Sequence, residues 1–552
     1  MFIRKRMIAT LFIASVLMCS TVTGCGEDEI TYVVEKNDAT YSPDRIRQLL
    51  DTWQHKTFNY FTDGADPASG MALEGSGRTQ DNVLTTGGTG FGLMALVVGT
   101  ERGWISRDQA AGQILRILNF LDKVDRYEGV WSHWYNFDGS QHAFEAAQEE
   151  AGDIVETSFL VSGFLCVEQY FNAMTDKEIE IRKIIDRFWN TINWRHYANN
   201  SDELSWYWSQ KTGEFSELKV GGNWNETWSV WLQALAAPEG HNMTPEQYKK
   251  SWLRNGALYQ PRNSYGYAYK LGWDRIGPLF FSHYSFLGYN PRQMHDGTVF
   301  YWDQNVKHTM INRHYCLTDA SKTYLYDEGN WGLSACYGTP DAEWVYHARE
   351  AHPDHDDGVI TPTAALSAYP YTPFYSTQVL LSLAKRTALY GEYGFGDAYR
   401  PSTGSVEKRH LAIDQGPIVV MIENYRSGLI WNLMMDNPRV RRGLELAGVT
   451  APASFDDGFH IAVPNTLTGR YDMMRHPDRL RYEIDFYLAQ GGEVRLEVVA
   501  ADGTVVHTVQ TSAHPGENQV AFDSDFIRKG RNYELRLSGA DGTPHQLPVV
   551  LH

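Results

Sequence analysis

The chain has 552 residues, of which 43% are hydrophobic and 13% aromatic, so it can bury a large core in two to four domains. Its formal net charge is −18 at pH 7. A chain this acidic is a poor partner for nucleic acid and for anionic lipid headgroups, whereas a neutral substrate is compatible with it.

The N-terminus has the pattern of a processing signal. Basic residues at positions 4–6 precede a short apolar run at 7–18, and small residues at 22–24 precede Cys25. The run is shorter than the roughly 20 apolar residues of a membrane-spanning helix. The pattern resembles a bacterial lipoprotein signal, so we expect residues 1–24 to be removed and Cys25 to be lipidated.

An acidic run at positions 26–29 follows the cysteine. It resembles the surface-export signal of Bacteroidetes lipoproteins, although a solvated tether explains it equally well. We therefore expect the protein to be lipid-anchored to the outer membrane, on its periplasmic or cell-surface face. We also expect it to be a monomer. Removal of the signal takes away three positive charges and leaves a net charge of −21.

Processing leaves three cysteines, Cys166, Cys316 and Cys336. A bridge between Cys316 and Cys336 is one reading, but three cysteines make no disulfide framework, and we expect buried thiols. No CxxC or HExxH pattern offers a metal site, and the run HPDHDD at 352–357 is better explained as a polar loop. We expect neither a metal nor a cofactor.

Helical patterns dominate the chain up to residue 446. Ser42 and Pro43 make a good helix start for residues 43–61, and a Gly-rich loop at 64–92 leads into a buried helix that opens at Thr89. Further helices are predicted at 106–124, 149–173, 176–193, 224–237, 244–258, 363–389, 417–434 and 436–446. Residues 127–141 are predicted as an aromatic loop and 265–350 as short elements. The pattern predicts an all-α core of ten to twelve helices.

The pattern changes after residue 450. Residues 480–488, 493–499 and 532–537 alternate at a period of two, and Gly-Gly and Asp-Gly pairs supply turns. These features predict a small C-terminal β-sandwich. The expected organisation is a signal peptide (1–24), a linker (25–42), a helical catalytic domain (43–450) and the β-sandwich (451–552).

Glu226 is the most informative acidic residue. It falls in the first turn of the predicted helix 224–237, where a carboxylate can simply answer the helix dipole. Five tryptophans crowd the same part of the chain, at positions 206, 208, 224, 228 and 231. Indole rings are flat apolar surfaces that suit stacking on sugar rings. A carboxylate among them favours glycoside chemistry.

Five motifs occur in order: GGTGFGLMAL at 87–96, ETSFL at 156–160, GNWNE at 222–226, GPLFF at 277–281 and DQGPIVVMIE at 414–423. Together they resemble the glycoamylase-like domain of Bacteroidetes lipoproteins, which is mostly assigned to glycoside hydrolase family 144. The resemblance covers about residues 43–446. It implies an (α/α)6 toroid and hydrolysis of β-1,2-glucan, either endo-acting or releasing sophorose from chain ends.

Glycoside hydrolysis needs one protonated and one ionised carboxyl group. Glu226 is the candidate general acid, in agreement with the family; the helix dipole would lower its pKa, so neighbouring carboxylates or apolar indole rings must offset that. Asp414 is the candidate general base, with helix capping as the alternative. Asp153 and Glu156 stand at i and i+3 on a predicted helix, where they can bind sugar hydroxyls or raise the pKa of Glu226.

Other side chains are candidate substrate contacts, although each is individually more often a core residue. They are His133, Trp134, Trp224, His283, Tyr284, Trp331 and Tyr337. Residues 331–340 depart from the family's usual Ala-Ser-Asp-Gly-Pro run, which puts the specificity of one subsite in question. Glu423, inside a hydrophobic run, is expected to form a structural pair, with Arg426 as the candidate partner.

Three functions fit these observations. The first is an inverting β-1,2-glucan hydrolase. The second is a retaining glucan transglycosylase like the related domain of cyclic glucan synthases. The third is a surface lipoprotein that captures glycan without cutting it, which the acids at all the family's catalytic positions disfavour. Glu226 and Asp414 come from distant segments of the expected toroid and can face each other across a wide mouth, which favours inversion.

Overall fold

The computed structural model describes residues 42–76, 83–144, 152–343 and 345–449. In the C-terminal part it describes 464–465, 470–471, 474–476, 478, 481–488, 492–513, 516–523, 531–538 and 544–551. The predicted signal peptide, Cys25 and most of the linker lie outside the described residues. Within the described segments, none of the helices combines the length and apolar character that a membrane crossing needs.

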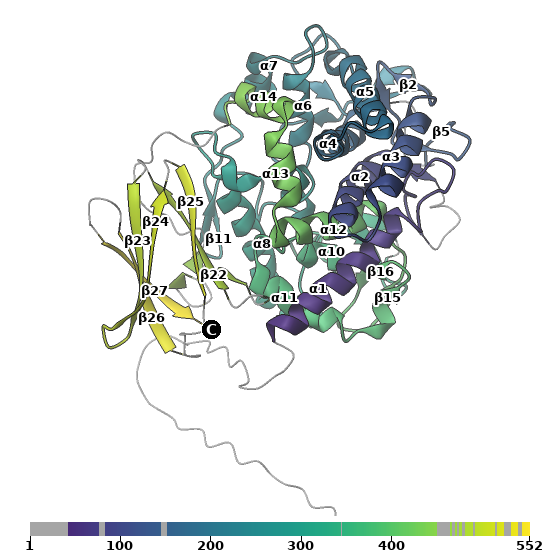
Figure 1. The fold of residues 1–552 in the computed structure, drawn as a ribbon. Coiled ribbons are helices and arrows are strands. Elements are labelled where there is room, and N and C mark those ends of the chain that lie inside the picture. The colour runs from purple at the N-terminus through teal and green to yellow at the C-terminus, as the bar shows by residue number, and fades with distance from the viewer. Residues whose placement is uncertain are drawn as a thin grey trace, which may run out of the picture.

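The helical part is a ring of inner elements backed by outer helices (Figure 1). The inner elements, in chain order, are α2 (Thr86–Glu101), α4 (Ile154–Tyr170), α6 (Trp228–Ala236), two 3₁₀ turns (Leu279–Ser282 and Ser285–Leu287), α10 (Pro362–Leu366) and α12 (Ala412–Arg426). α12 closes the ring on α2. This is the (α/α)6 toroid that the resemblance implied.

Outer helices cover the ring. They are α1 (Pro43–Phe58), α3 (Arg107–Leu121), α5 (Asp176–Thr191), α7 (Pro245–Ser251), α8 (Tyr301–Leu317), α9 (Ser321–Tyr324), α11 (Pro373–Leu383), α13 (Leu429–Asp436) and α14 (Pro438–Leu446). The predicted helix 363–389 is two helices, α10 and α11. The predicted helix 417–434 is α12 followed by α13, and α12 starts earlier than predicted because Pro417 is accommodated inside it.

Glycines in the first family motif allow α2 to lie directly against α4. A Cβ on Gly90 would stand 2.2 Å from Phe159 O, and one on Gly163 would stand 2.4 Å from Gly90 O. Only glycine fits at both positions, because no real Cβ approaches a backbone oxygen so closely. The Gly-rich run, predicted in part as a loop, therefore belongs to the most closely packed pair of inner helices.

Helix α8 lies in the region that the sequence predicts as short elements. Its buried face includes polar side chains that hydrogen-bond loop backbone: His308 Nε2 lies 2.8 Å from Gly277 O, Asn312 Nδ2 donates to Leu333 O, and Leu333 N donates to Asn312 Oδ1. Because these buried positions are polar, the helix lacks the apolar periodicity that would have revealed it.

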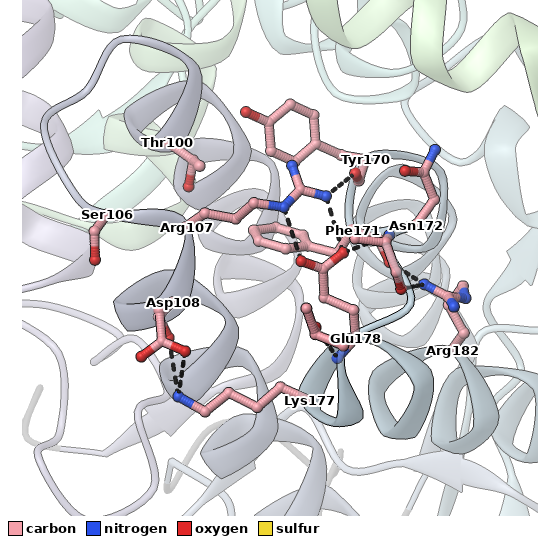
Figure 2. A network of polar contacts seen from close by, with 12 residues as sticks. Thr100, Ser106, Arg107, Asp108, Tyr170, Phe171, Asn172, Lys177, Glu178 and Arg182 are labelled. Carbon is pink, nitrogen blue, oxygen red and sulfur yellow. Dashed lines mark hydrogen bonds and ion pairs between the residues drawn. The ribbon is translucent and has the colours of Figure 1, made fainter.

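The outer layer between α3 and α5 is joined by ion pairs (Figure 2). Arg107 holds Glu178 in two hydrogen bonds, Nε to Oε1 at 2.8 Å and Nη2 to Oε2 at 2.9 Å. Arg107 Nη2 also donates to Tyr170 O, and Arg182 Nη1 donates to Phe171 O. These two arginines therefore satisfy carbonyl groups at the C-terminal end of α4, which the helix itself leaves unpaired.

The described strands from Met474 onward form two antiparallel sheets, seen in yellow in Figure 1. One contains β21 (Met474–His476), β22 (Arg481–Leu488) and β25 (Gly516–Asp523); the other contains β23 (Gly492–Ala500), β24 (Val505–Ala513), β26 (Arg531–Ser538) and β27 (Pro544–Leu551). Side chains of both sheets, including Ile484, Leu496 and Phe522, share one buried core, as predicted for a β-sandwich. Tyr425 of α12 donates to the carboxylate of Asp478 and so joins the two parts.

The three cysteines of the helical part are free and buried, as expected. Cys336 lies beside Arg349, whose Nη1 donates to Cys336 O at 2.7 Å. In the polar run 352–357, Asp357 binds Arg349 and Asp356 accepts a hydrogen bond from Tyr326. Glu423 forms the expected structural pair, but its partner is Arg102 rather than Arg426. Arg426 instead binds Gln54 and Asp51.

Candidate active site

A cavity of about 410 Å³ opens where the N-terminal ends of several inner helices meet. Its walls come from α4, α12, the turns beside α6 and the hairpin of β13 (Ala335–Tyr337) and β14 (Tyr346–Ala348). The lining residues are Glu74, Thr85, His133, Trp134, Phe144, Val155, Glu156, Phe159, Trp206, Glu226, Phe280, Tyr284, Ala335, Tyr337, Tyr346, His347, Ala348 and Ile413. These lining residues include no lysine or arginine. They include Glu156 and Glu226, two of the acids that the sequence singles out.

Glu226 lies in the turn before α6, not in its first turn as predicted. The helix begins at Trp228, and Asn225 Oδ1 accepts hydrogen bonds from the N–H and hydroxyl of Thr227 at 3.0 and 2.6 Å. Burial raises the pKa of Glu226 to about 7, because the ionised carboxylate loses solvation. Loss of solvation is the larger cause, and a hydrogen bond from the backbone of Glu226 itself opposes it.

The backbone of Glu226 is held by Ser285 from the neighbouring 3₁₀ turn. Ser285 Oγ donates to Glu226 O at 2.6 Å and accepts from Ser229 N at 3.1 Å. The hydroxyl is buried, so this pair of bonds fixes the turn that carries the carboxyl group.

Asp153 and Glu156 converge on one histidine. His133 Nδ1 lies 3.3 Å from Asp153 Oδ2, and His133 Nε2 lies 3.6 Å from Glu156 Oε1. Asp153 is the N-cap of α4, since its Oδ1 accepts from Val155 N and Glu156 N at 2.8 and 3.0 Å. It therefore does not lie on a helix face with Glu156, as the predicted helix 149–173 required, because α4 begins only at Ile154.

Glu156 occupies a space made by glycine. Its Oε2 accepts from Gly87 N at 2.9 Å, and a Cβ on Gly87 would stand 2.3 Å from the same oxygen. Burial raises the pKa of Glu156 to about 8; the His133 ring opposes the shift, whereas the charges of Asp153 and Glu74 add to it. Glu156 is thus a second cavity carboxyl group that favours its protonated form near neutral pH.

Asp414 lies in the first turn of α12, beside the cavity and 1% exposed. Its carboxyl group lies within hydrogen-bonding reach of that of Asp397, so that the two can share a proton. Asp397, 2% exposed, accepts a further bond from Tyr337 N at 2.7 Å. Burial raises the pKa of Asp414 well above its usual value, and the neighbouring Asp397 raises it further.

Tyr284 shows that the acids belong to one site. Its ring stacks on Phe280, with ring centres 5.1 Å apart, and lines the cavity. Burial raises the pKa of its hydroxyl well above the usual value, and the charges of Asp414, Glu226 and Glu156 raise it further. The fold therefore gathers the four acids singled out by sequence around Tyr284 and His133.

The candidate substrate contacts divide into two groups. His133, Trp134, Tyr284 and Tyr337 line the cavity. Trp224, His283 and Trp331 do not line it, because each is at most 1% exposed. Trp224 packs among aromatic rings, with its centre 5.7 Å from those of Trp228 and Tyr301. The structure therefore places these three side chains in the core and not on the cavity wall.

Some cavity residues were missed. Glu74 and Tyr346 line the wall, and Asp397 lies against Asp414. Tyr346 and Tyr337 pack with ring centres 5.4 Å apart on the hairpin that includes the departure from the family pattern. A helical or strand period gives no signal for such loop residues; the only sequence sign was the aromatic and glycine content around them.

Comparisons with known proteins identify relatives of this chain. The family model "Glycoamylase", described as "Putative glucoamylase", matches residues 221–438. The chain is 38% identical over 438 residues to the exo β-1,2-glucooligosaccharide sophorohydrolase (non-reducing end) of Parabacteroides distasonis. That match covers 74% of this chain, which spans 60% of the length of that curated relative.

Solved structures show the same similarity. The endo-β-1,2-glucanase of Chitinophaga pinensis, in complex with sophorotriose and glucose, is 39% identical with a TM-score of 0.69. That match covers 74% of this chain and 99% of the other. The endo-β-1,2-glucanase of Talaromyces funiculosus, 11% identical over 73% of this chain and 89% of its own, has a TM-score of 0.53 and shares the fold.

Proposed function

The chain belongs to the glycoamylase-like family (glycoside hydrolase family 144), and from this premise we propose that it hydrolyses β-1,2-glucan. The observation that carries the proposal is Glu226: a cavity carboxyl group with no cationic partner among the described residues and a pKa of about 7. Such a group is half protonated at neutral pH and is suited to donate a proton to a leaving glycosidic oxygen.

The reaction needs a second carboxyl group. Asp414 serves as the general base, which takes a proton from the water that attacks the anomeric carbon. Glu226 and Asp414 are carried by separate elements of the ring, and burial rather than Asp414 sets the pKa of Glu226. Inverting enzymes hold their two acids about 6.5–9.5 Å apart to admit a water, and retaining enzymes about 5–5.5 Å. We propose the wider, inverting arrangement for this pair.

Product analysis tests the activity and its stereochemistry together. Linear β-1,2-glucan is incubated with the protein, and the earliest product is followed by proton NMR. We expect shorter glucans or sophorose with the α-anomer growing in first. A β-anomer appearing first, or transfer to added acceptor sugars, would favour the retaining transglycosylase. Binding of the glucan without any cleavage would favour the capture protein.

We also propose that the protein is anchored to the outer membrane through Cys25. The support is the small-residue run before that cysteine. Cys25→Ser should block lipidation and signal processing. A variant that is cleaved at the same site and still fractionates with the membrane would show that the lipoprotein interpretation is wrong.

A further inference from the structure

The proposed general base lies in surroundings that disfavour its charge. A base must hold an unprotonated oxygen toward water, yet Asp414 is almost completely buried and neither of its carboxyl oxygens receives an N–H or a hydroxyl hydrogen bond from the described residues. A buried carboxylate without donors is costly, so Asp414 is stable here only as a neutral acid or in a shared hydrogen bond.

Asp397 supplies that shared bond. Two carboxyl groups in hydrogen-bond contact must hold a proton between them, because two carboxylates would repel. The backbone decides where the proton lies. Tyr337 N donates to Asp397 Oδ2 at 2.7 Å and the nearby Arg409 favours its charged form, whereas Asp414 has no comparable donor. In the resting protein Asp414 therefore holds the proton and Asp397 is the carboxylate.

Resting on the hydrolysis proposed above, we propose that Asp397 is the terminal proton acceptor of the reaction and acts through Asp414. Asp414 is the group next to the cavity, since its neighbour Ile413 lines the wall and its charge acts on the cavity residue Tyr284. Asp397 is a positioning residue, which does not touch substrate but gives Asp414 a place to pass its proton.

The protons balance in one step. Water loses a proton to the free oxygen of Asp414 while Asp414 passes its own proton to Asp397. The water oxygen bonds to the anomeric carbon, the glycosidic bond breaks, and the leaving oxygen takes the proton of Glu226. At the end both aspartates are neutral and Glu226 is ionised, and exchange with solvent restores the starting state.

This relay resolves the conflict between burial and basicity. The effective base is Asp397, whose pKa burial raises to about 6, a value near the working range of a general base. Other titratable groups also face the pair from the elements around it, and they are unchanged in the variants below. They are Glu74, Tyr284, Cys336, Tyr346, Glu407 and Arg409.

The pair is tested first without substrate. Infrared titration of the ligand-free protein follows the carbonyl stretch of protonated carboxyl groups, and the signal that Asp414→Asn removes belongs to Asp414. We expect it to persist above neutral pH in the wild type and to disappear at lower pH in Asp397→Asn, because that variant loses a like charge and the shared bond. An unshifted titration would overturn the pair, whatever the substrate of the protein is.

The relay is tested by the acidic limb of kcat/KM on β-1,2-glucan. A pair that works with one proton bound loses activity only when a second proton binds, at a pH well below the one at which infrared shows Asp414 losing its proton. If Asp414 acted as a simple base, the two transitions would coincide in the wild type, and the proposal would be wrong. This comparison needs no variant, so a folding defect does not affect it.

Asp397→Asn sharpens the result. We expect kcat to fall about 10²-fold or more with KM changed less than twofold. The pH of the acidic limb of kcat/KM should then equal the pH at which the infrared signal of Asp414 disappears in this variant. Asp356→Asn is the matched control: Asp356 is also a buried carboxyl group whose pKa burial raises to about 6, but it binds Tyr326 away from the cavity. In Asp356→Asn, kcat and the pH of the acidic limb of kcat/KM should stay at wild-type values. A wild-type kcat in Asp397→Asn would refute the proposal.

Discussion

Two glutamates, one in the cavity and one in the outer layer between α3 and α5, have pKa values shifted in opposite directions. In the outer layer the Glu178 side chain, 4% exposed, lies against Arg107, and the hydrogen bonds from that arginine lower its pKa (Figure 2). In the cavity Glu226 has no such partner among the described residues, and burial raises its pKa to about 7. The residue type is the same, and the difference in neighbours is plain: Glu178 has a paired arginine that lowers its pKa, and Glu226 has none among the described residues.

The opposite pKa shifts of Glu178 and Glu226 have opposite effects on the free energy of unfolding. A paired carboxylate favours the folded state at neutral pH, since its charge is satisfied only there. An unpaired one does the reverse: because the folded pKa of Glu226 is raised, the free energy of unfolding falls as pH rises from about 4.5 to about 7. The cavity thus retains a reactive proton at a cost in stability that the outer layer helps to offset.

The same substitution in the two regions tests this contrast, and the largest effect is expected in the cavity. Glu226→Gln should lower kcat on β-1,2-glucan by about 10²–10⁴-fold, because a carboxamide cannot donate the acidic proton. Its melting temperature at pH 8 should equal or exceed that of the wild type, since a disfavoured buried charge is removed. Steady-state kinetics and thermal unfolding measure both; retention of more than a tenth of the activity would remove Glu226 from the acid role.

Glu178→Gln should give the opposite result. The variant loses the charge that Arg107 pairs with, and we expect a loss of about 1–3 kcal/mol in the free energy of unfolding with kcat unchanged. The pKa of Glu178 is lowered in the folded state, so the wild-type advantage should be present above pH 4.5 and disappear as the pH falls below it. Denaturant unfolding at several pH values measures this difference, and a lowered kcat would contradict the separation.

The sequence predicted the toroid well where helices bury apolar faces, and the four acids it singled out, Glu226, Asp414, Asp153 and Glu156, lie in or beside one cavity. It missed α8, because that helix buries polar side chains such as His308 and Asn312 to satisfy loop backbone. It also missed Asp397, which lies in an irregular segment and acts through a contact with Asp414 far away in the fold. Trp224 looked like a sugar platform from its neighbours in sequence, yet only packing shows that it is core.

The smallest effect is expected at Ser285, a buried residue that contacts the backbone of the cavity acid. This side chain contributes to the scaffold, but its hydroxyl donates to Glu226 O and so positions the cavity acid. Ser285→Ala should cost about 1 kcal/mol in stability and about fivefold in kcat, because the backbone of Glu226 loses its donor and Ser229 N its acceptor.

A neighbouring serine provides the matched control for that prediction. Ser282 is equally buried on the adjacent 3₁₀ turn, but its hydroxyl pairs with His308 Nδ1 at 2.7 Å and has no contact with Glu226. Ser282→Ala should lose similar stability and keep wild-type kcat. If both variants lowered kcat alike, general loosening of the 3₁₀ turns would explain the effect. If only Ser285→Ala lowered it, the hydrogen bond from Ser285 to Glu226 O would be what positions the acid for catalysis.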